Sequence, residues 1–294
     1  MIKITVFTPA YNRAHTIGRT YESLCRQTCK DFKWLVIDDG STDNTKGLVE
    51  EWKGRDNGFD IRYVWKENGG LHTGYNKAIE LADTELCVCI DSDDYMPDDA
   101  VEKILICWKE KGCSDVAGIM GLDYLMDGTS LGDMFPPIEK CHIYELENKF
   151  HHKEDVKMVA RVDLLKQVYP QPVYNHEKNF NPSYMYYEID FKYKWLVLNE
   201  NLCIVDYQAD GMANGIFRQY LNSPNSFAAI RVQKFKIPGA PLVFYAKQYI
   251  HLASSAILAH NYSWLKKAPR PWLACSFLPL GWLLSLYIRY RAKK

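Results

Sequence analysis

The chain has 294 residues and no formal net charge, because its 36 basic residues balance its 36 acidic ones. A chain without excess positive charge has no bulk attraction for a polyanion, so we expect no nucleic-acid partner. Its length can enclose a large core in one domain, or in one domain with an appendage. The nine cysteines include no CxxC pair, and their odd number favours a reduced compartment over a secreted one.

The first part of the chain alternates between short apolar runs and longer amphipathic runs. The apolar runs predict buried strands, and the amphipathic runs predict helices that cover them. Repeated strand–helix units of this kind build a parallel sheet with helices on both faces, which is an α/β fold. We predict strands at 2–8, 32–37, 61–65 and 86–90, and helices at 17–24, 43–52, 75–82 and 100–109.

Asp91, Ser92 and Asp93 directly follow the strand that ends at Ile90. The carboxyl ends of parallel strands share one edge of the sheet, where such sheets bind ligands. Carboxylates this close raise each other's pKa unless a cation neutralises them. Mg²⁺ and Mn²⁺ accept such oxygen ligands and usually share a substrate's phosphates. We therefore predict Mn²⁺ or Mg²⁺ at Asp93 and Asp91, although acidic capping of the next helix also fits.

The candidate nucleotide-binding residues follow the other predicted strands. Tyr11 offers a ring for a base to stack on, and Asn12 offers an amide. Asp38 or Asp39 can accept a hydrogen bond from a pyrimidine N–H, and Gly70 permits close backbone approach. Each signal alone also fits a turn, a helix cap or a surface residue, so their combination carries the prediction. The predicted set is Pro9, Tyr11, Asn12, Asp38, Asp39, Gly70, Asp91 and Ser92.

Four short motifs follow one another in this part of the chain: TPAYN at 8–12, VIDDGSTD at 36–43, ENGG at 67–70 and IDSDD at 90–94. In this order and spacing they resemble the motifs of the family 2 glycosyltransferases. The resemblance covers residues 1–120 and implies the GT-A fold, a Rossmann-like and mostly parallel sheet flanked by helices. It also implies a nucleoside-diphosphate-sugar donor, with uracil recognised at Asp38 or Asp39 and therefore a UDP-sugar. A weaker similarity to small bacterial capsule and O-antigen transferases rests on 159–165, 176–180 and 207–211.

The catalytic base is harder to place. Inverting transfer needs a carboxylate that deprotonates the acceptor hydroxyl, and the resemblance leads us to expect an acid where this chain has Ser183. The candidates are Glu177, Glu188 and Asp190. We favour Glu177, because residues 176–178 are similar to a Gly-Glu-Lys pattern of the family. Glu188 and Asp190 would point the same way on a strand and diverge on a helix. Each of the three also fits a salt-bridge partner.

The strand–helix alternation weakens after Gly121, which suggests three ranges. We assign 1–120 to the nucleotide-sugar-binding half, 121–230 to the acceptor side of the same catalytic domain, and 231–294 to a helical, membrane-associating extension. Residues 271–288 carry no charge and are flanked by lysine and arginine on both sides. The stretch is barely long enough to span a membrane, and Pro279 and Gly281 interrupt it. Basic residues at both ends also argue against a membrane-spanning helix. We expect an anchor in the membrane plane, and a helix buried on the domain is the alternative.

These observations predict a metal-dependent inverting glycosyltransferase that moves one sugar to a lipid-linked surface-glycan precursor. The N-terminus lacks a signal-peptide layout, so we expect a peripheral or monotopic protein at the cytoplasmic face of the cell membrane. The chain has no Gln-x-x-Arg-Trp motif, which argues against a processive synthase. A catalytically degenerate subunit that binds nucleotide or glycan is the main alternative. A sugar nucleotidyltransferase is disfavoured, because no glycine-rich basic loop follows the first strand.

Overall fold

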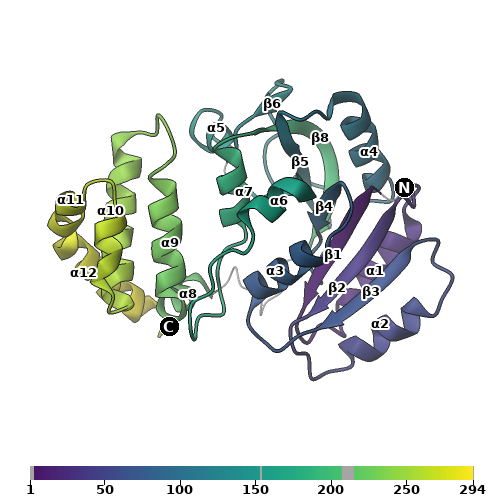
Figure 1. Ribbon diagram of the computed structural model, residues 1–294, viewed down its shortest axis with the longest axis horizontal. Coiled ribbons are helices and arrows are strands. Elements are labelled where there is room, and N and C mark those ends of the chain that lie inside the picture. The colour runs from purple at the N-terminus through teal and green to yellow at the C-terminus, as the bar shows by residue number, and fades with distance from the viewer. Residues whose placement is uncertain (1–2, 153, 207–214, 294) are drawn as a thin grey trace. The chain divides into compact units, whose positions relative to one another are not determined.

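The computed structural model describes residues 3–152, 154–206 and 215–293, which form two compact units (Figure 1). The first unit comprises 1–69, 73–170 and 185–208, and the second comprises 70–72, 171–184 and 209–294. The motif predicted at 207–211 lies outside the described residues. The second unit therefore includes residues that precede 231, where the predicted helical extension begins. The assignment of functions to three sequence ranges stays a prediction.

The first unit is built on one eight-stranded mixed sheet, in the order β3-β2-β1-β4-β7-β5-β8-β6. β1 to β4 run parallel to one another, as the apolar runs predict. β7 runs antiparallel to both β4 and β5, while β8 is parallel to β5. The strands are β1 (Ile4–Ala10), β2 (Phe32–Asp38), β3 (Asp60–Trp65), β4 (Leu86–Cys89), β5 (Val116–Leu125), β6 (Lys140–Cys141), β7 (Val156–Arg161) and β8 (Lys194–Val205).

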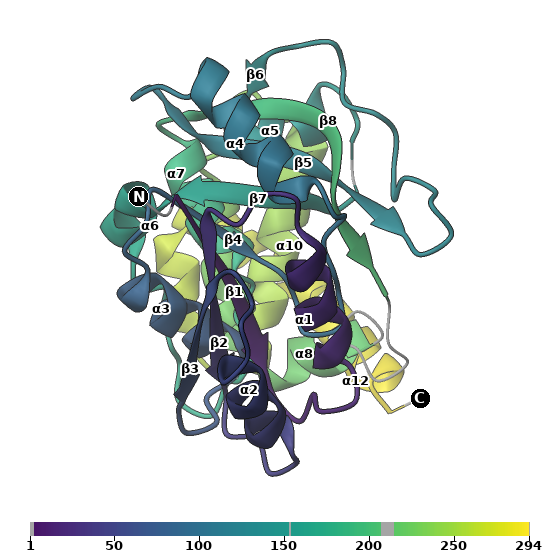
Figure 2. The same cartoon turned by 90° about the vertical axis from the view of Figure 1, so that its right-hand side faces the viewer.

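Helices cover both faces of the parallel part of the sheet (Figures 1 and 2). Every residue of β1 is buried, as expected for a strand covered on two sides. Ile4 and Val6 pack in the core cluster with α1, whereas the Phe7 ring meets Tyr75 of α3 at 4.9 Å. The helices of this unit are α1 (Ile17–Arg26), α2 (Thr45–Lys53), α3 (Leu71–Leu81), α4 (Ala100–Lys111), α5 (Ile143–Asn148), α6 (Val162–Val168) and α7 (Ser183–Asp190), the first residues of α3 and α7 belonging to the second unit.

The second unit is helical, with α10 at its centre. Its core gathers Phe180, Tyr249, Leu252 and Trp264. A Cβ at Gly281 would come within 2.5 Å of the Ala253 Cβ, so only glycine lets α12 pack this closely on α10. The elements are α8 (Ile216–Asn222), α9 (Pro224–Lys234), α10 (Leu242–Leu258), the 3₁₀ helix η2 (Tyr262–Lys267), α11 (Pro271–Ser276) and α12 (Leu278–Arg291).

The uncharged C-terminal stretch therefore folds as two helices that break at Phe277. One side of α12 is buried, through Gly281, Ser285 and Ile288. The other side exposes large apolar residues: Leu280, Trp282, Leu283, Leu286, Tyr287 and Tyr290. α12 therefore packs on α10 of its own unit and also presents an apolar face, and contact of that face with a membrane stays a prediction. Among the described residues, no helix has the length and hydropathy to span a membrane.

Candidate active site

The carboxyl ends of the first four strands meet at one edge of the sheet. Ala10, the last residue of β1, lies opposite Asp38, and Asp38 lies opposite Trp65 at the end of β3. On the other side of β1, Phe7 lies opposite Cys89, so the acidic loop after β4 leaves the same edge. The sequence-predicted nucleotide and metal residues of the first unit therefore come from neighbouring strands.

Asn12 joins the loop after β1 to the loop after β2. Its backbone N–H donates to Ser41 Oγ at 2.9 Å, and its side-chain Oδ1 accepts from the Thr42 N–H at 2.8 Å. Its φ of 53° is left-handed, which asparagine tolerates better than most residues. The Tyr11 side chain beside it is 49% exposed, in a position to stack on a base. Pro9, by contrast, is buried within β1.

Asp38 and Asp39 have different surroundings. Asp38 is fully buried, and its carboxylate accepts from the Ser41 N–H at 2.7 Å and from the Tyr63 hydroxyl. Burial and the Asp38 charge together raise the pKa of Tyr63. Both carboxylate oxygens of Asp38 thus bind groups of the protein, as do those of Asp39, and contact of a base with either residue stays a prediction.

Asp39 fixes the loop that follows β3. Its Oδ1 accepts from the Gly69 N–H at 2.9 Å and forms an ion pair with Lys66, while its backbone carbonyl accepts from the Asn68 amide at 2.7 Å. Lys66 was not foreseen from the sequence. Its only signal was a lysine placed directly after the end of a predicted strand.

Gly70 has a φ of +92°, and a Cβ there would lie 1.9 Å from the carbonyl oxygen of Lys178. Both residues belong to the second unit. The predicted close backbone approach is therefore present, and it brings Gly70 against protein backbone. A role of Gly70 in nucleotide binding stays a prediction.

The acidic loop begins two residues after β4. The Cys89 thiol lies 3.6 Å from Asp91 Oδ1, Ser92 is buried, and Asp93 is half-buried. Burial raises the pKa of Asp93, and the neighbouring Asp91 charge raises it further, while Arg13 opposes both effects. A cation placed between the two carboxylates would relieve this repulsion.

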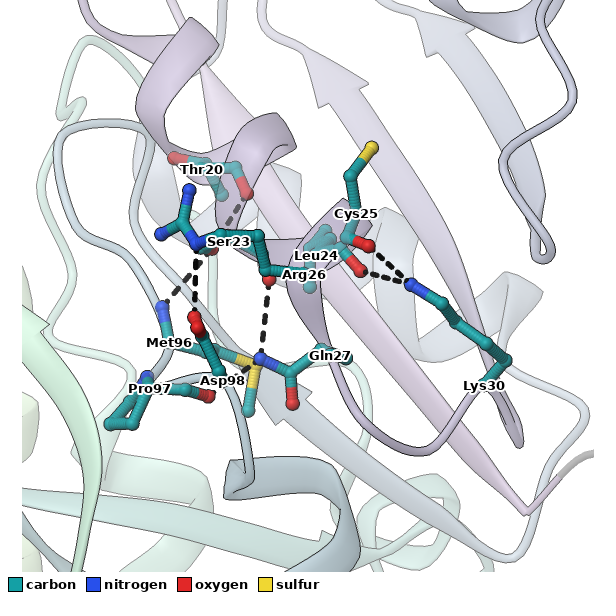
Figure 3. Close-up of polar contacts among 10 residues, drawn as sticks. All are labelled: Thr20, Ser23, Leu24, Cys25, Arg26, Gln27, Lys30, Met96, Pro97 and Asp98. Atoms are coloured by element: carbon teal, nitrogen blue, oxygen red, sulfur yellow. Dashed lines mark hydrogen bonds and ion pairs between the residues drawn. The ribbon is translucent and has the colours of Figure 1, made fainter.

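α1 and the residue after it, Gln27, hold the segment that follows the acidic loop (Figure 3). The Gln27 amide donates to the Pro97 carbonyl at 2.6 Å, and Ser23 Oγ accepts from the Met96 N–H at 3.2 Å. Earlier in α1, the Thr20 hydroxyl donates to the carbonyl of Asp94, in the acidic loop, at 2.7 Å. The acidic residues thus lie on a loop whose backbone is fixed from a neighbouring helix.

A nearly buried ion pair accompanies the acidic loop. Lys157 of β7 lies 3.8 Å from Asp123 of β5, with side chains 11% and 4% exposed. Burial raises the pKa of Asp123 to about 6, although the charge of Lys157 lowers it. Burial disfavours the charged form of Lys157, but Asp123, Cys203, Asp94 and Asp91 raise its pKa above the ordinary value. The sequence signal was a charged residue inside each apolar run, and nothing in it showed that the two would pair.

Two carboxylates fit a cation that arrives with its substrate. No group of three or more His, Cys, Asp or Glu side chains among the described residues could hold a metal by itself. Mg²⁺ and Mn²⁺ are commonly held by one or two carboxylates, with phosphates and water supplying the remaining ligands. Asp91 and Asp93, whose charges repel each other, meet that requirement.

Glu177, the favoured candidate base, lies in the second unit at the start of α9. It is 6% exposed, and its carboxylate accepts four hydrogen bonds of 2.6 to 2.8 Å from the backbone N–H and side chains of Asn225 and Ser226. A carboxylate at a helix N-terminus compensates the unpaired N–H groups and the helix dipole. The geometry therefore gives Glu177 a capping role, which the sequence could not reveal because its partners lie far along the chain.

Replacing Glu177 with Gln should lower the free energy of unfolding by about 1–2 kcal/mol, because charge-assisted hydrogen bonds become neutral ones. Replacement with Ala should cost about 2–4 kcal/mol, because it leaves buried donors unpaired. Urea unfolding followed by tryptophan fluorescence measures both values. A Glu177→Gln protein with wild-type stability and no activity would instead identify Glu177 as the base.

Asp190 and Glu188 lie on α7, so the two side chains diverge as expected for a helix. Asp190 is fully buried and accepts from the Ile143 N–H at 2.8 Å at the start of α5. Its hydrogen bond with His142 raises the pKa of that histidine.

Glu188 is half-buried. The neighbouring Tyr186 lies close enough to Asp91 for their charges to interact, so α7 runs beside the acidic loop. Because Glu177 and Asp190 both bind backbone N–H groups at helix starts, Glu188 is the candidate base that remains, and its role stays a prediction.

The family model described as glycosyl transferase family 2 matches residues 5–159, more than half of the chain. The chain therefore belongs to glycosyl transferase family 2. This finding confirms the resemblance seen in the four sequence motifs, and the mixed sheet with its flanking helices confirms the predicted GT-A fold class.

Curated relatives match somewhat more than a third of the chain. Chondroitin synthase of Pasteurella multocida is 37% identical over 107 residues, which cover 36% of this chain and 11% of that protein. The putative teichuronic acid biosynthesis glycosyltransferase TuaG of Bacillus subtilis is 32% identical over 111 residues, which cover 38% of this chain and 44% of TuaG. The aligned part of this chain thus spans less than half of either relative.

A solved structure matches almost the whole chain. The crystal structure of S. aureus TarS 1-349 superposes with a TM-score of 0.62 at 17% identity, covering 99% of this chain and 92% of that one. TarS 1-349 in complex with UDP-GlcNAc gives a TM-score of 0.61 at 18% identity, covering 99% and 88%. At this identity the likeness establishes a shared fold.

Proposed function

We propose that this chain is a metal-dependent inverting glycosyltransferase that transfers one sugar from a UDP-sugar to a lipid-linked surface-glycan precursor. The observation that carries the proposal is the pair Asp91 and Asp93 at the strand edge, whose repulsion a cation would relieve. Family membership and the nucleotide-sugar complex of TarS support the donor class. Chondroitin synthase and TuaG, both named for polysaccharide synthesis, support the product class.

In this proposal the first unit binds the donor through several groups. Tyr11 stacks on the base, and Asp39 accepts its N–H. Asp93 and Asp91 would hold Mn²⁺ or Mg²⁺. When bound, such a cation would stabilise the negative charge that builds on the departing diphosphate.

Glu188 acts in this scheme on the acceptor. Its carboxylate takes the proton of the acceptor hydroxyl as the oxygen attacks the anomeric carbon of the donor. A new bond forms between that oxygen and the anomeric carbon, while the bond from the anomeric carbon to the diphosphate oxygen breaks. The electron pair of the broken bond leaves with UDP, and the configuration at the anomeric carbon inverts.

A panel of sugar nucleotides tests this proposal. The purified full chain is incubated with UDP-, GDP-, CMP- and dTDP-sugars, with Mn²⁺ or with EDTA, and nucleotide release is measured. Because water can replace the missing acceptor slowly, we expect metal-dependent release of UDP from at least one UDP-sugar. A folded protein that releases nucleotide from none of them, and binds none, would contradict the proposal and favour a catalytically degenerate subunit.

We further propose that the protein works at the cytoplasmic face of the cell membrane as a peripheral or monotopic protein. The exposed face of α12 carries Trp282 and Leu286, and Arg289 and Arg291 lie in its last turn. Trp and Leu enter the membrane interface, and nearby bases attract anionic head groups.

Replacing both Trp282 and Leu286 with Ser should weaken vesicle binding at least about tenfold, because burial of each side chain contributes about 1.5–3 kcal/mol. Co-sedimentation with phosphatidylglycerol vesicles measures the effect. Ile106→Ser on α4 is the matched control, since that side chain is also about half exposed (50%). Equal losses in the double variant and the control, or no loss in either, would contradict membrane contact through α12.

A further inference from the structure

Arg231 of α9 is a partly buried arginine whose guanidinium has only neutral hydrogen-bond partners among the described residues. Its Nη1 donates to Gln248 Oε1 and its Nη2 to the Tyr220 hydroxyl, both at 3.3 Å. Its Nε is buried and finds no hydrogen-bond partner within the described residues. No carboxylate in the described part of the chain pairs with it, and Tyr220 is the only titratable group that acts on its pKa. A charge withdrawn from water without a counter-ion is costly, so this arrangement is suited to an anion supplied from outside the chain.

The surroundings of Arg231 are basic and aromatic. His251 and Lys247 of α10 lie near enough for Arg231 and Lys247 to act on the histidine. Burial, followed by these two charges, lowers the pKa of His251 to about 4. The Tyr220 ring lies 6.1 Å from the His251 ring and 4.3 Å from the Phe227 ring. Positive charge therefore accumulates between α8, α9 and α10.

The same helices connect this cluster to the exposed face of α12. α8 contacts α12 through Phe217, whose ring lies 5.7 Å from that of Tyr287. The Arg291 guanidinium lies 4.7 Å from the Phe217 ring and donates to the Tyr287 hydroxyl at 2.7 Å. α10 packs directly against α12 through Gly281. An anion bound by Arg231 would thus be held by the helices that carry the apolar face.

We propose that Arg231, with the Tyr220 hydroxyl and Lys247, binds the phosphate or diphosphate of a lipid. The planar guanidinium fork matches two phosphate oxygens, and the phenol adds a further donor. Under the proposed function, on which this inference rests, that phosphate is the one that links the acceptor glycan to its lipid. The site would bring the acceptor's head group to the enzyme while the lipid chain stays at the α12 face.

Arg231→Met tests the site, with Arg218→Met as the control because Arg218 is an exposed arginine on α8 of the same unit. The probes are inorganic pyrophosphate, measured by calorimetry, and vesicles of phosphatidylcholine that contain either a prenyl diphosphate or phosphatidylglycerol at equal charge. EDTA is present in the pyrophosphate and vesicle measurements, so that the donor site does not bind pyrophosphate through a metal. Thermal unfolding without ligand is measured for each protein.

We expect the wild type and Arg218→Met to bind prenyl-diphosphate vesicles more tightly than phosphatidylglycerol vesicles. Arg231→Met should bind prenyl diphosphate at least ~10-fold more weakly, because charge-assisted contacts are lost. Its unfolding midpoint without ligand should be unchanged or higher, because an unpaired buried charge has been removed. UDP binding with Mn²⁺ should be unchanged, which separates failure of this site from failure of the proposed function.

Three results would overturn the inference. One is equal binding of prenyl diphosphate by the wild type and Arg231→Met. Another is a lower unfolding midpoint in Arg231→Met together with unaltered pyrophosphate binding, which would make Arg231 a structural residue. The third is binding of pyrophosphate without any preference for prenyl-diphosphate vesicles, which would assign the site to free phosphate.

Discussion

Replacing Asp93 with Asn should reduce sugar transfer by about 10³-fold or more, because loss of the cation site removes several kcal/mol of charge stabilisation from the leaving diphosphate. The substitution keeps the size of the side chain and removes its charge. The metal concentration that gives half-maximal activity should rise strongly at the same time. Initial rates of UDP release, measured over a series of Mn²⁺ concentrations, give both quantities.

Asp98→Asn is the matched control for this prediction. Asp98 lies in the segment that follows the acidic loop, and its ion pair with Arg26 is exposed, so its loss should have little effect on stability. We expect near wild-type rates and metal dependence for this variant. If Asp93→Asn behaved in the same way as Asp98→Asn, the acidic loop would not be the metal site.

Replacing Glu188 with Gln should lower the transfer rate by about 10²–10⁴-fold, which is the usual contribution of a general base. Donor binding should be retained, so that kcat falls while the KM for the sugar nucleotide stays near its wild-type value. Residual activity should also lose the dependence on pH that deprotonation of the base imposes. Rates of transfer to a lipid-linked acceptor, measured across a pH series, test these expectations.

Glu200→Gln controls for the loss of one carboxylate in the same unit, because Glu200 forms an exposed pair with Lys103. Wild-type transfer by Glu188→Gln would require another base. Since Glu177 and Asp190 both cap helices, the search would then turn to the residues outside the described ranges.

The sequence predicted the part of the site that depends on local pattern. The apolar runs of β1 to β4 are short and each is followed by polar residues, so parallel pairing alone brings Asp39 and Asp91 to one edge. The boundaries shifted by a few residues, as in α3, which starts at Leu71 rather than at Tyr75. Family membership followed from the same four motifs.

The sequence could not separate residues whose roles depend on distant partners. Asp38 and Asp39 are adjacent and chemically identical, and they are distinguished by partners such as Tyr63 on β3 and Lys66 directly after it. Glu177 was favoured as the base for its similarity to a family pattern, and its hydrogen-bond partners, 48 and 49 positions ahead, gave no local signal of another role. The charge on Arg231 was likewise uninformative until its neighbours from α8 and α10 were known.

The C-terminal stretch shows the same limit. The sequence showed that this stretch carries no charge. It did not show which side of the helix would pack against the protein. Gly281 and Ser285 are small enough to let α12 approach α10, and this contact decides that Trp282 and Leu286 remain on the outside. Whether that outer face meets a membrane is a matter for the vesicle experiment.

Calorimetric titration of the full chain with UDP, with and without Mn²⁺, tests the central claim most directly. A cation held by Asp91 and Asp93 would join the diphosphate to the protein. We therefore predict binding that is strong with Mn²⁺, much weaker in EDTA, and equally weak for Asp93→Asn under either condition. A folded wild-type protein that binds no UDP in the presence of Mn²⁺ would contradict the account.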